Sequence, residues 1–211
     1  LIDLAPDNFY GMGSVDPNRE DAVVIVKDCF ENLKLDGMVL DPSQQRFYPN
    51  DEKIYPIYEI CQKYNKPIVI KTGISLEPKT SGKFAQPIYL DDVLNTFPDL
   101  RVGMTSFGWP WVTEAATLML KHKNLFTDTA LLYFDSADEF YEFVLKKQLG
   151  HLWIDRSLCQ QVMFGTLSGH FNQIRQIDAI KKVEFREETK ESILYRNALI
   201  FLGIEKREDR G

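Results

Sequence analysis

The sequence contains little cysteine and little histidine. Its 211 residues include three histidines and three cysteines, and Cys29, Cys61 and Cys159 stand far apart with no Cys-x-x-Cys pair. A small, odd number of separated cysteines argues against a disulfide framework and against a cysteine zinc site. The pattern is typical of reduced thiols, so we expect a cytoplasmic protein.

Long apolar runs and strongly basic segments are also missing. No apolar run approaches the roughly 20 residues that cross a bilayer, and no signal peptide opens the chain. Lysine and arginine number 25 against 31 acidic residues, which gives a net charge of −6, and basic residues form only short pairs such as Lys146-Lys147. We therefore expect neither a membrane nor a nucleic acid as a main partner.

What the chain does contain is enough apolar sequence for a core. Hydrophobic residues make up 44% of it and aromatic residues 12%, so we expect one domain over residues 1–211. The segment from Pro67 to Ile70 is apolar and β-branched, which is typical of a strand buried on both faces, and it ends at Lys71, Thr72 and Gly73. Polar groups in that position indicate the carboxyl edge of a sheet, where α/β enzymes place their chemistry.

Strands and helices are predicted to alternate along the whole chain. The strands are expected over residues 9–15, 36–40, 67–70, 100–105, 125–129 and 161–166. The helices are expected over residues 19–33, 54–64, 89–97, 113–120, 136–149, 172–182 and 187–203, with Asn18 and Ser136 as N-caps. Residues 74–86 form a loop with the length of a lid. The alternation indicates an α/β fold with parallel strands, either an open doubly wound sheet or a (β/α)8 barrel that lacks two strands.

Seven short motifs follow one another along the chain. They are Y-G-M-G-S-V-D-P at 10–17, G-M-V-L-D-P at 37–42, K-P-I-V-I-K-T-G at 66–73, F-P-D-L-R-V-G-M-T-S-F-G-W-P-W at 97–111, K-N-L-F-T-D-T at 123–129, V-M-F-G-T at 162–166 and R-N-A-L-I-F-L-G at 196–203. In this order they resemble the amidohydrolase-2 branch of the metal-dependent amidohydrolase superfamily, which includes aromatic-acid decarboxylases and lactone or amide hydrolases. The resemblance implies a distorted (β/α)8 TIM-like barrel, with six of its eight strands in this chain. Strands one and two are then expected upstream of Leu1, or absent.

Three positions depart from the family pattern. The resemblance places Lys71 where the family has a metal-binding histidine in H-T-G, and Ser106 where it has a histidine two residues before a glycine. Leu167 stands where F-G-T-D has its metal-binding aspartate. An ammonium has no free lone pair and leucine has no donor atom, so the usual zinc site cannot form from these positions. We expect no metal cofactor, unless residues upstream of Leu1 restore a site.

Four residues at strand ends are candidate catalytic groups: Lys71, Asp41, Ser106 and His170. Lys71 could be a Schiff-base nucleophile, a general base or a carboxylate-binding cation. It could instead form an ion pair with Asp41 or another carboxylate at the rim, in the volume of the lost metal site. Ser106 could bind a substrate oxygen or be a small polar plug. His170 could move protons together with Asp41, or lie in a surface loop.

Five further residues are candidates for substrate binding: Thr72, Trp109, Trp111, Asp128 and Thr166. The two tryptophans could line the mouth of a pocket, form a dimer interface or pack under the loop that contains them. Asp128 could act as an acid or base, or be held structurally by Lys71 or by N–H groups of a loop.

Three classes of function follow. The first is a divergent hydrolase or decarboxylase that acts on a small carboxylate- or carbonyl-containing molecule without the usual metal. The second is a catalytically inactive protein that keeps the fold as a ligand- or partner-binding module. The third is a Schiff-base lyase that uses Lys71. We expect a small-molecule substrate or ligand and a homodimer.

Overall fold

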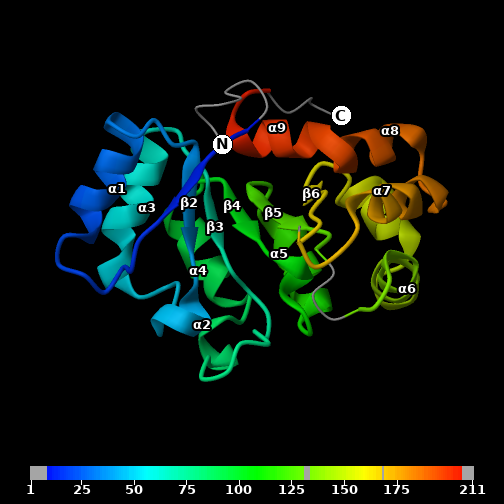
Figure 1. Ribbon diagram of the computed structural model, residues 1–211, viewed down its shortest axis with the longest axis horizontal. Helices are drawn as coiled ribbons and strands as arrows, with labels where there is room; N and C mark the ends of the chain where they lie inside the picture. Colours follow the sequence, from blue (N-terminus) through cyan, green and yellow to red (C-terminus); the bar gives the residue numbers. More distant parts are fainter. Residues whose placement is uncertain (1–8, 131–133, 168, 206–211) are drawn as a thin grey trace.

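One parallel sheet forms the centre of the protein (Figure 1). The computed structural model describes residues 9–130, 134–167 and 169–205. Six strands lie in chain order, and all neighbouring strands pair in parallel. They are β1 (Met12–Ser14), β2 (Gly37–Leu40), β3 (Ile68–Ile70), β4 (Val102–Met104), β5 (Leu125–Asp128) and β6 (Val162–Met163). The six predicted strands are confirmed, although each is shorter than predicted.

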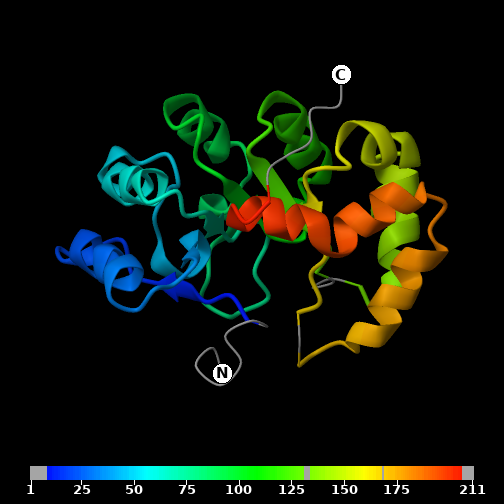
Figure 2. The same ribbon diagram turned by 90° about the horizontal axis from the view of Figure 1, so that it is seen from above.

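Helices follow the strands and form an arc around one side of the sheet (Figure 2). They are α1 (Ala22–Glu31), α3 (Tyr55–Lys63), α4 (Tyr89–Thr96), α5 (Val112–Lys121), α6 (Ala137–Phe140) continued by the π-helix η5 (Tyr141–Gln148), α7 (Gln173–Lys182), and α8 (Glu187–Glu191) continued by η7 (Ser192–Arg196) and α9 (Asn197–Leu202). These confirm the seven predicted helical segments. In the part of the chain that the structure describes, every helix is too short or too polar to cross a bilayer.

Five short elements were not predicted. They are α2 (Pro42–Gln45), η2 (Glu52–Ile54), η3 (Gly82–Phe84), η4 (Ser106–Gly108) and η6 (Trp153–Ser157). Each is only a turn or two long, and no hydrophobic period signals a helix there. Of the two predicted N-caps, Ser136 is confirmed, since its hydroxyl accepts from the Glu139 N–H. Asn18 is wrong, because α1 begins after Asp21 and the Asn18 side chain bonds to Asp16 and to the carbonyl of Gln45.

The strands have two different faces because side chains alternate along each strand. One face packs against the helices, and its side chains are fully buried. Its side chains pair across the sheet at two levels. The first level consists of Met38, Ile68, Val102 and Leu125, and the second consists of Leu40, Ile70 and Met104. These residues, together with the inward faces of the helices, form the main hydrophobic core.

The other face of the sheet is concave and carries a separate, smaller core. Val69, Gly103 and Phe126 lie on it at one level, since they pair across β3, β4 and β5. Phe201 and Ile200 of α9 pack into this layer with Phe126 and Met163. A Cβ atom on Gly103 would lie 3.1 Å from the Phe201 ring, so the glycine makes room for that ring.

Helix α9 lies along the amino edge of the sheet, opposite the edge where α2 follows β2 (Figure 1). Arg101, just before β4, donates from Nε to the carbonyl of Phe201 at 2.7 Å. Its other guanidinium nitrogens donate to the carbonyl and the side-chain oxygen of Asn65, both at 2.7 Å. The amino edge is therefore covered, and any site on the concave face has to lie at the carboxyl edge.

Replacing Phe201 by alanine tests whether the small core holds α9 in place. We expect Phe201→Ala to lower the unfolding free energy by about 3–5 kcal/mol, because a buried ring is removed and a cavity remains. For a chain of this size that is a fall in melting temperature of roughly 6–20 °C, measured by circular dichroism. Ile204→Ala is the matched control, because Ile204 is half exposed just beyond α9. An equal effect of both variants would contradict the role of Phe201.

Candidate functional site

The carboxyl ends of four strands place four side chains at one level of the concave face. The register identifies them. The last paired residues of β2, β3 and β4, and Thr127 of β5, point toward the helices: they are Leu40, Ile70, Met104 and Thr127. The residue that follows each of them must point the opposite way, onto the concave face. These following residues are Asp41, Lys71, Thr105 and Asp128. We call this set the edge level.

Asp41 and Lys71 are joined within the edge level. The Lys71 ammonium lies 3.2 Å from Asp41 Oδ2, and the two side chains are 52% and 17% exposed. The other carboxylate oxygen of Asp41 accepts from the Gln44 N–H at 3.1 Å and so caps α2. The ion pair is the contact that the structural interpretation of Lys71 predicted, and the roles in substrate binding stay predictions. The half-exposed Lys71 side chain gives no support to a desolvated Schiff-base amine.

Asp128 lies at the far end of the edge level, at the last position of β5. Its Oδ1 accepts from the N–H groups of Ser106 at 2.9 Å and of Ala130 at 3.0 Å. Burial raises the pKa of the Asp128 carboxyl group, and the two N–H donors oppose that shift without cancelling it. A Cβ on Gly165 would lie 3.1 Å from the Asp128 Cβ, so this glycine lets the chain after β6 pass beside the carboxyl group.

The turn after β4 is held by side chains of β5. Ser106, Phe107 and Gly108 all have left-handed backbones, with φ of 49°, 52° and 60°. The Thr127 hydroxyl accepts from the Phe107 N–H at 2.9 Å, beside the bond from Ser106 to Asp128. Such conformations cost about 1–3 kcal/mol for a residue other than glycine and collect at functional sites. Ser106 therefore contributes its backbone N–H to the site.

Thr72 and Thr105 bind each other at the ends of β3 and β4. The Thr105 hydroxyl donates to the Thr72 carbonyl at 3.0 Å and accepts from the Thr72 N–H at 3.1 Å. The Thr72 hydroxyl donates to the Thr105 carbonyl at 3.4 Å. Sequence reasoning missed Thr105 because it followed the family motif to Ser106. The alternation along β4, in which Thr105 stands two positions after Gly103, is the signal that would have found it.

The two tryptophans lie where the turn after β4 meets the long loop 74–86. Trp109 packs edge-on against Phe134 at 5.1 Å and Phe143 at 6.0 Å, and its carbonyl accepts from the Ile74 N–H at 2.8 Å. Trp111 caps α5 and lies next to Gly82 of the loop. The loop is also tied at its base, where the Gly73 N–H donates to Ala85 at 2.9 Å.

The chain after β6 carries the remaining candidates. The carbonyl of Thr166 accepts from the Gln176 side chain at 3.0 Å, which joins this segment to α7. Leu167 has a left-handed backbone and is 38% exposed. His170 is exposed, and its N–H donates to the Leu167 carbonyl at 3.2 Å. Among the described residues, no hydrogen bond or ion pair connects the His170 side chain to the edge level.

The residues at the family's metal positions do not fit a metal ion. Lys71 presents an ammonium, Ser106 is bound through its backbone, and Leu167 has no donor atom. In residues 9–130, 134–167 and 169–205, no group of three or more histidine, cysteine, aspartate or glutamate side chains lies close enough to hold one. The arrangement can bind an anion at Lys71 and hold a proton at Asp128.

Known structures with the same architecture are TIM barrels. The chain aligns over 96% of its length with an uncharacterised TIM-barrel protein, Bb4693 of Bordetella bronchiseptica, at 23% identity and a TM-score of 0.80, covering 70% of that chain. It aligns likewise with 5-carboxyvanillate decarboxylase LigW2 of Novosphingobium aromaticivorans, solved with manganese and a substituted nitrobenzoic acid, at 15% identity, a TM-score of 0.69 and 67% coverage of that chain. A third is 4-oxalomesaconate hydratase LigJ of Rhodopseudomonas palustris, at 18% identity, a TM-score of 0.69 and 68% coverage of that chain. These likenesses show the TIM-barrel type of fold.

The family follows from the sequence itself. The sequence model of the amidohydrolase-2 family, described as Amidohydrolase, matches residues 2–204, so the chain belongs to that family. A comparison with curated proteins found no significant match. The predicted family and the predicted fold class are both confirmed.

The raised pKa of Asp128 predicts how its replacement by asparagine changes stability with pH. A carboxyl group whose pKa is higher in the folded protein than in the unfolded chain stabilises the fold in its protonated form. This contribution to the unfolding free energy is complete below the pKa of the unfolded chain, about 3.9, and is lost as the pH rises through the pKa of the folded protein. Asparagine stays neutral and can accept the same two N–H bonds. We therefore expect Asp128→Asn to melt at a higher temperature than the wild type at pH 7, with a smaller difference at pH 4.5. The exposed Asp99→Asn is the control, and a lower melting temperature of Asp128→Asn at pH 7 would refute the expectation.

Proposed function

We propose that the carboxyl edge of the sheet binds a small carboxylate-bearing molecule through Lys71. The observation that carries this proposal is the half-exposed Lys71 ammonium, which stands on the concave face at a metal position of the family. The Lys71 ammonium has three N–H donors. One of them points to Asp41, whose other carboxylate oxygen caps α2. The donors that point away from Asp41 can bind a ligand. LigW2, a relative in fold, was solved with an aromatic acid, which favours a carboxylate as the ligand.

Asp41 has a positioning role in this proposal. Its carboxylate is fixed by the Gln44 N–H, and its own N–H donates to the Gln45 side chain at 2.8 Å. It therefore holds the Lys71 ammonium at the edge level. A ligand carboxylate that approaches Lys71 from the concave side adds a second anion to a cation that is already oriented.

Decarboxylation without a metal is a second candidate function, and the raised pKa of Asp128 favours it. When the bond between the carboxylate and the adjacent carbon breaks, carbon dioxide leaves and the electron pair stays on that carbon. The carbon then needs a proton, and the Asp128 carboxyl group, whose pKa is raised by burial, lies on the same level of the sheet and can supply it. Hydrolysis is less well supported, because Leu167 stands where the family has the aspartate that activates water.

Binding at Lys71 can be tested with benzoate and 5-carboxyvanillate as probes. We expect Lys71→Met to weaken binding by about tenfold or more, the range of a hydrogen bond to a charged group, and Lys71→Arg to retain most of it. Isothermal titration calorimetry measures the affinity. Lys66→Met is the matched control, because Lys66 pairs with Asp36 at 3.7 Å at the opposite end of β3. Equal losses in Lys66→Met and Lys71→Met would mean that only net charge matters.

Decarboxylation can be tested by measuring carbon dioxide released from 5-carboxyvanillate. If Asp128 is the acid, Asp128→Asn should lower the rate by about a hundredfold or more, with the affinity for benzoate unchanged. Dialysis against a chelator should leave the wild-type rate unchanged. Activity that is lost with the chelator would reject the metal-free reaction, and an unchanged rate in Asp128→Asn would reject the role of Asp128.

The expected homodimer and the cytoplasmic location stay predictions. Light scattering of the purified protein measures the first directly.

A further inference from the structure

The long loop after β3 is anchored on both neighbours of that strand. At its start, the Ile74 N–H donates to the carbonyl of Trp109, in the turn after β4, at 2.8 Å. Near its end, the Ser81 N–H donates to the carbonyl of Ser43, in α2 after β2, at 3.3 Å. Because β2 and β4 lie on either side of β3, residues 75–80 pass across the carboxyl end of β3. We call residues 75–80 the tip.

The hydrogen bonds of the tip are internal. The Glu77 N–H donates to the Ser75 hydroxyl at 3.1 Å, and the Thr80 hydroxyl donates to the Glu77 carbonyl at 2.8 Å. Within the part of the chain that the structure describes, no hydrogen bond or ion pair joins the tip to another segment. A Cβ on Gly82 would lie 2.4 Å from the Ile74 side chain, so the two ends of the loop touch. Compact loops with adjoining ends are frequently functional.

Leu76 is an exposed apolar residue in this tip. It is 64% exposed, whereas its neighbours in the tip include the polar residues Ser75 and Thr80. Glu77 and Lys79 carry opposite charges, so the tip has no net charge with which to attract an anion. Burial of the leucine against an apolar surface is favourable, and this is the contribution that the tip can make to binding.

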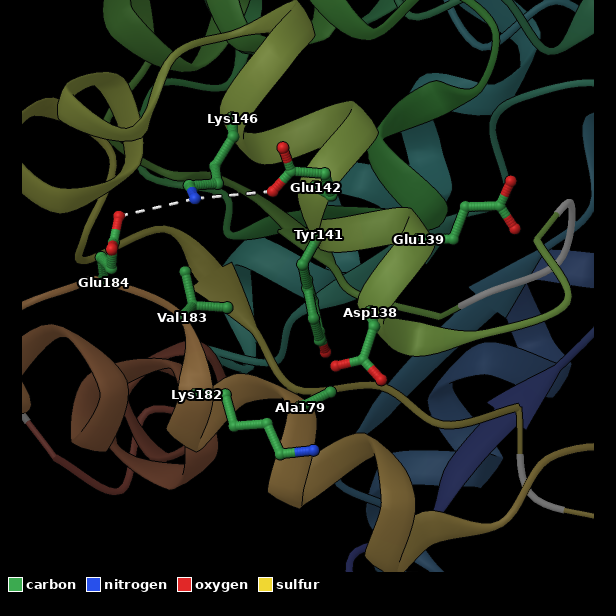
Figure 3. A pocket seen from close by; sticks show the side chains of 9 residues that line it. All are labelled: Asp138, Glu139, Tyr141, Glu142, Lys146, Ala179, Lys182, Val183 and Glu184. Atoms are coloured by element: carbon green, nitrogen blue, oxygen red, sulfur yellow. Dashed lines mark ion pairs between the residues drawn. The ribbon is translucent and has the colours of Figure 1, made fainter.

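A carboxylate bound at Lys71 would need a cover. The ammonium is half exposed, and contact with water weakens an ion pair that exclusion of water would strengthen. The cavity of about 490 Å³ in Figure 3 gives no such cover, because it lies in the helix layer, where Lys146 bridges Glu142 and Glu184 at 3.5 Å each. The tip begins four residues after Lys71 and crosses the end of the same strand, so it lies close enough to provide the cover.

We propose that the tip is a lid, which closes over a carboxylate bound at Lys71 and brings Leu76 onto the apolar part of the ligand. This inference rests on the function proposed above. Gly73 and Gly82 flank the tip as hinges, and Gly73 has a φ of 93°, a conformation that glycine adopts readily. Leu76 is then a residue that determines specificity, because it favours carboxylates with an apolar body over small ones.

The specificity is tested with benzoate and with acetate, which has only a methyl group beside its carboxylate. We expect Leu76→Ala to weaken benzoate binding about fivefold or more and to leave acetate binding unchanged, while Leu76→Met retains both. Titrations of the whole protein followed by nuclear magnetic resonance measure the affinities. Leu33→Ala is the matched control, because Leu33 is 61% exposed just beyond α1. An equal effect of Leu76→Ala on the two ligands would overturn the proposal.

Proteolysis tests the closure itself. Trypsin cuts after lysine, and Lys79 is exposed in the tip. We expect saturating benzoate to slow cleavage after Lys79 about fivefold or more, and to leave cleavage after the exposed Lys34 unchanged. The protection should disappear in Lys71→Met, which does not hold the ligand. Unchanged cleavage after Lys79 in the benzoate complex would contradict the lid.

Failure of the lid and failure of the proposed function give different results. If benzoate does not bind to the wild type, binding at Lys71 is rejected and the lid with it. If benzoate binds through Lys71 but Leu76→Ala binds it as tightly and Lys79 stays as accessible, only the lid is rejected. If Lys79→Met weakens both ligands and Leu76→Ala weakens neither, the tip acts through its charge, and the role of Leu76 is rejected.

Discussion

The register of the parallel strands is the constraint on which the rest of the structure depends. Leu40, Ile70 and Met104 are paired across the sheet and buried against the helices, so the residues after them must face the concave side together. A slip of one residue in β2 or β3 would bury Asp41 or Lys71 among the helices. The hydrophobic core thus determines where the charged groups lie, before any contact between those groups forms.

Backbone contacts then make the carboxyl edge rigid. Side chains of β5 hold the left-handed turn after β4, and the threonine pair ties β3 to β4. The strain in Ser106 and Phe107 persists because Thr127 and Asp128 occupy both N–H groups. Asp128 consequently has two roles: its carboxylate holds the turn after β4, and its own pKa is raised by burial. Its removal would change the turn as well as the chemistry, which is why asparagine, which keeps the acceptor, is the informative replacement.

The sequence predicted the strands and helices well because apolar periodicity is a local property. An ion pair of Lys71 with Asp41 or another rim carboxylate was one of the predicted alternatives, since these groups follow strands that end at one edge, and the structure has the pair with Asp41. The sequence did not reveal Thr105, because the family motif drew attention to Ser106, although the alternation along β4 places Thr105 on the same face as Gly103. The cap formed by Asp41 on α2 was missed as well, because a helix of four residues has no apolar period that would signal it.

The substitutions at the family's metal positions change what the edge can do in a definite direction. A lysine ammonium supplies a positive charge and three donors, but it cannot coordinate water or lower the pKa of a bound water molecule. Leucine at position 167 removes the carboxylate that would take a proton from water. On the proposed function, therefore, attraction of an anion is kept, whereas Lys71 and Leu167 give no group that would activate water. Carboxylate binding needs only the first of these properties, and release of carbon dioxide needs in addition a proton donor such as Asp128. Hydrolysis needs the activation of water, and for this physical reason we rank it below carboxylate binding and decarboxylation.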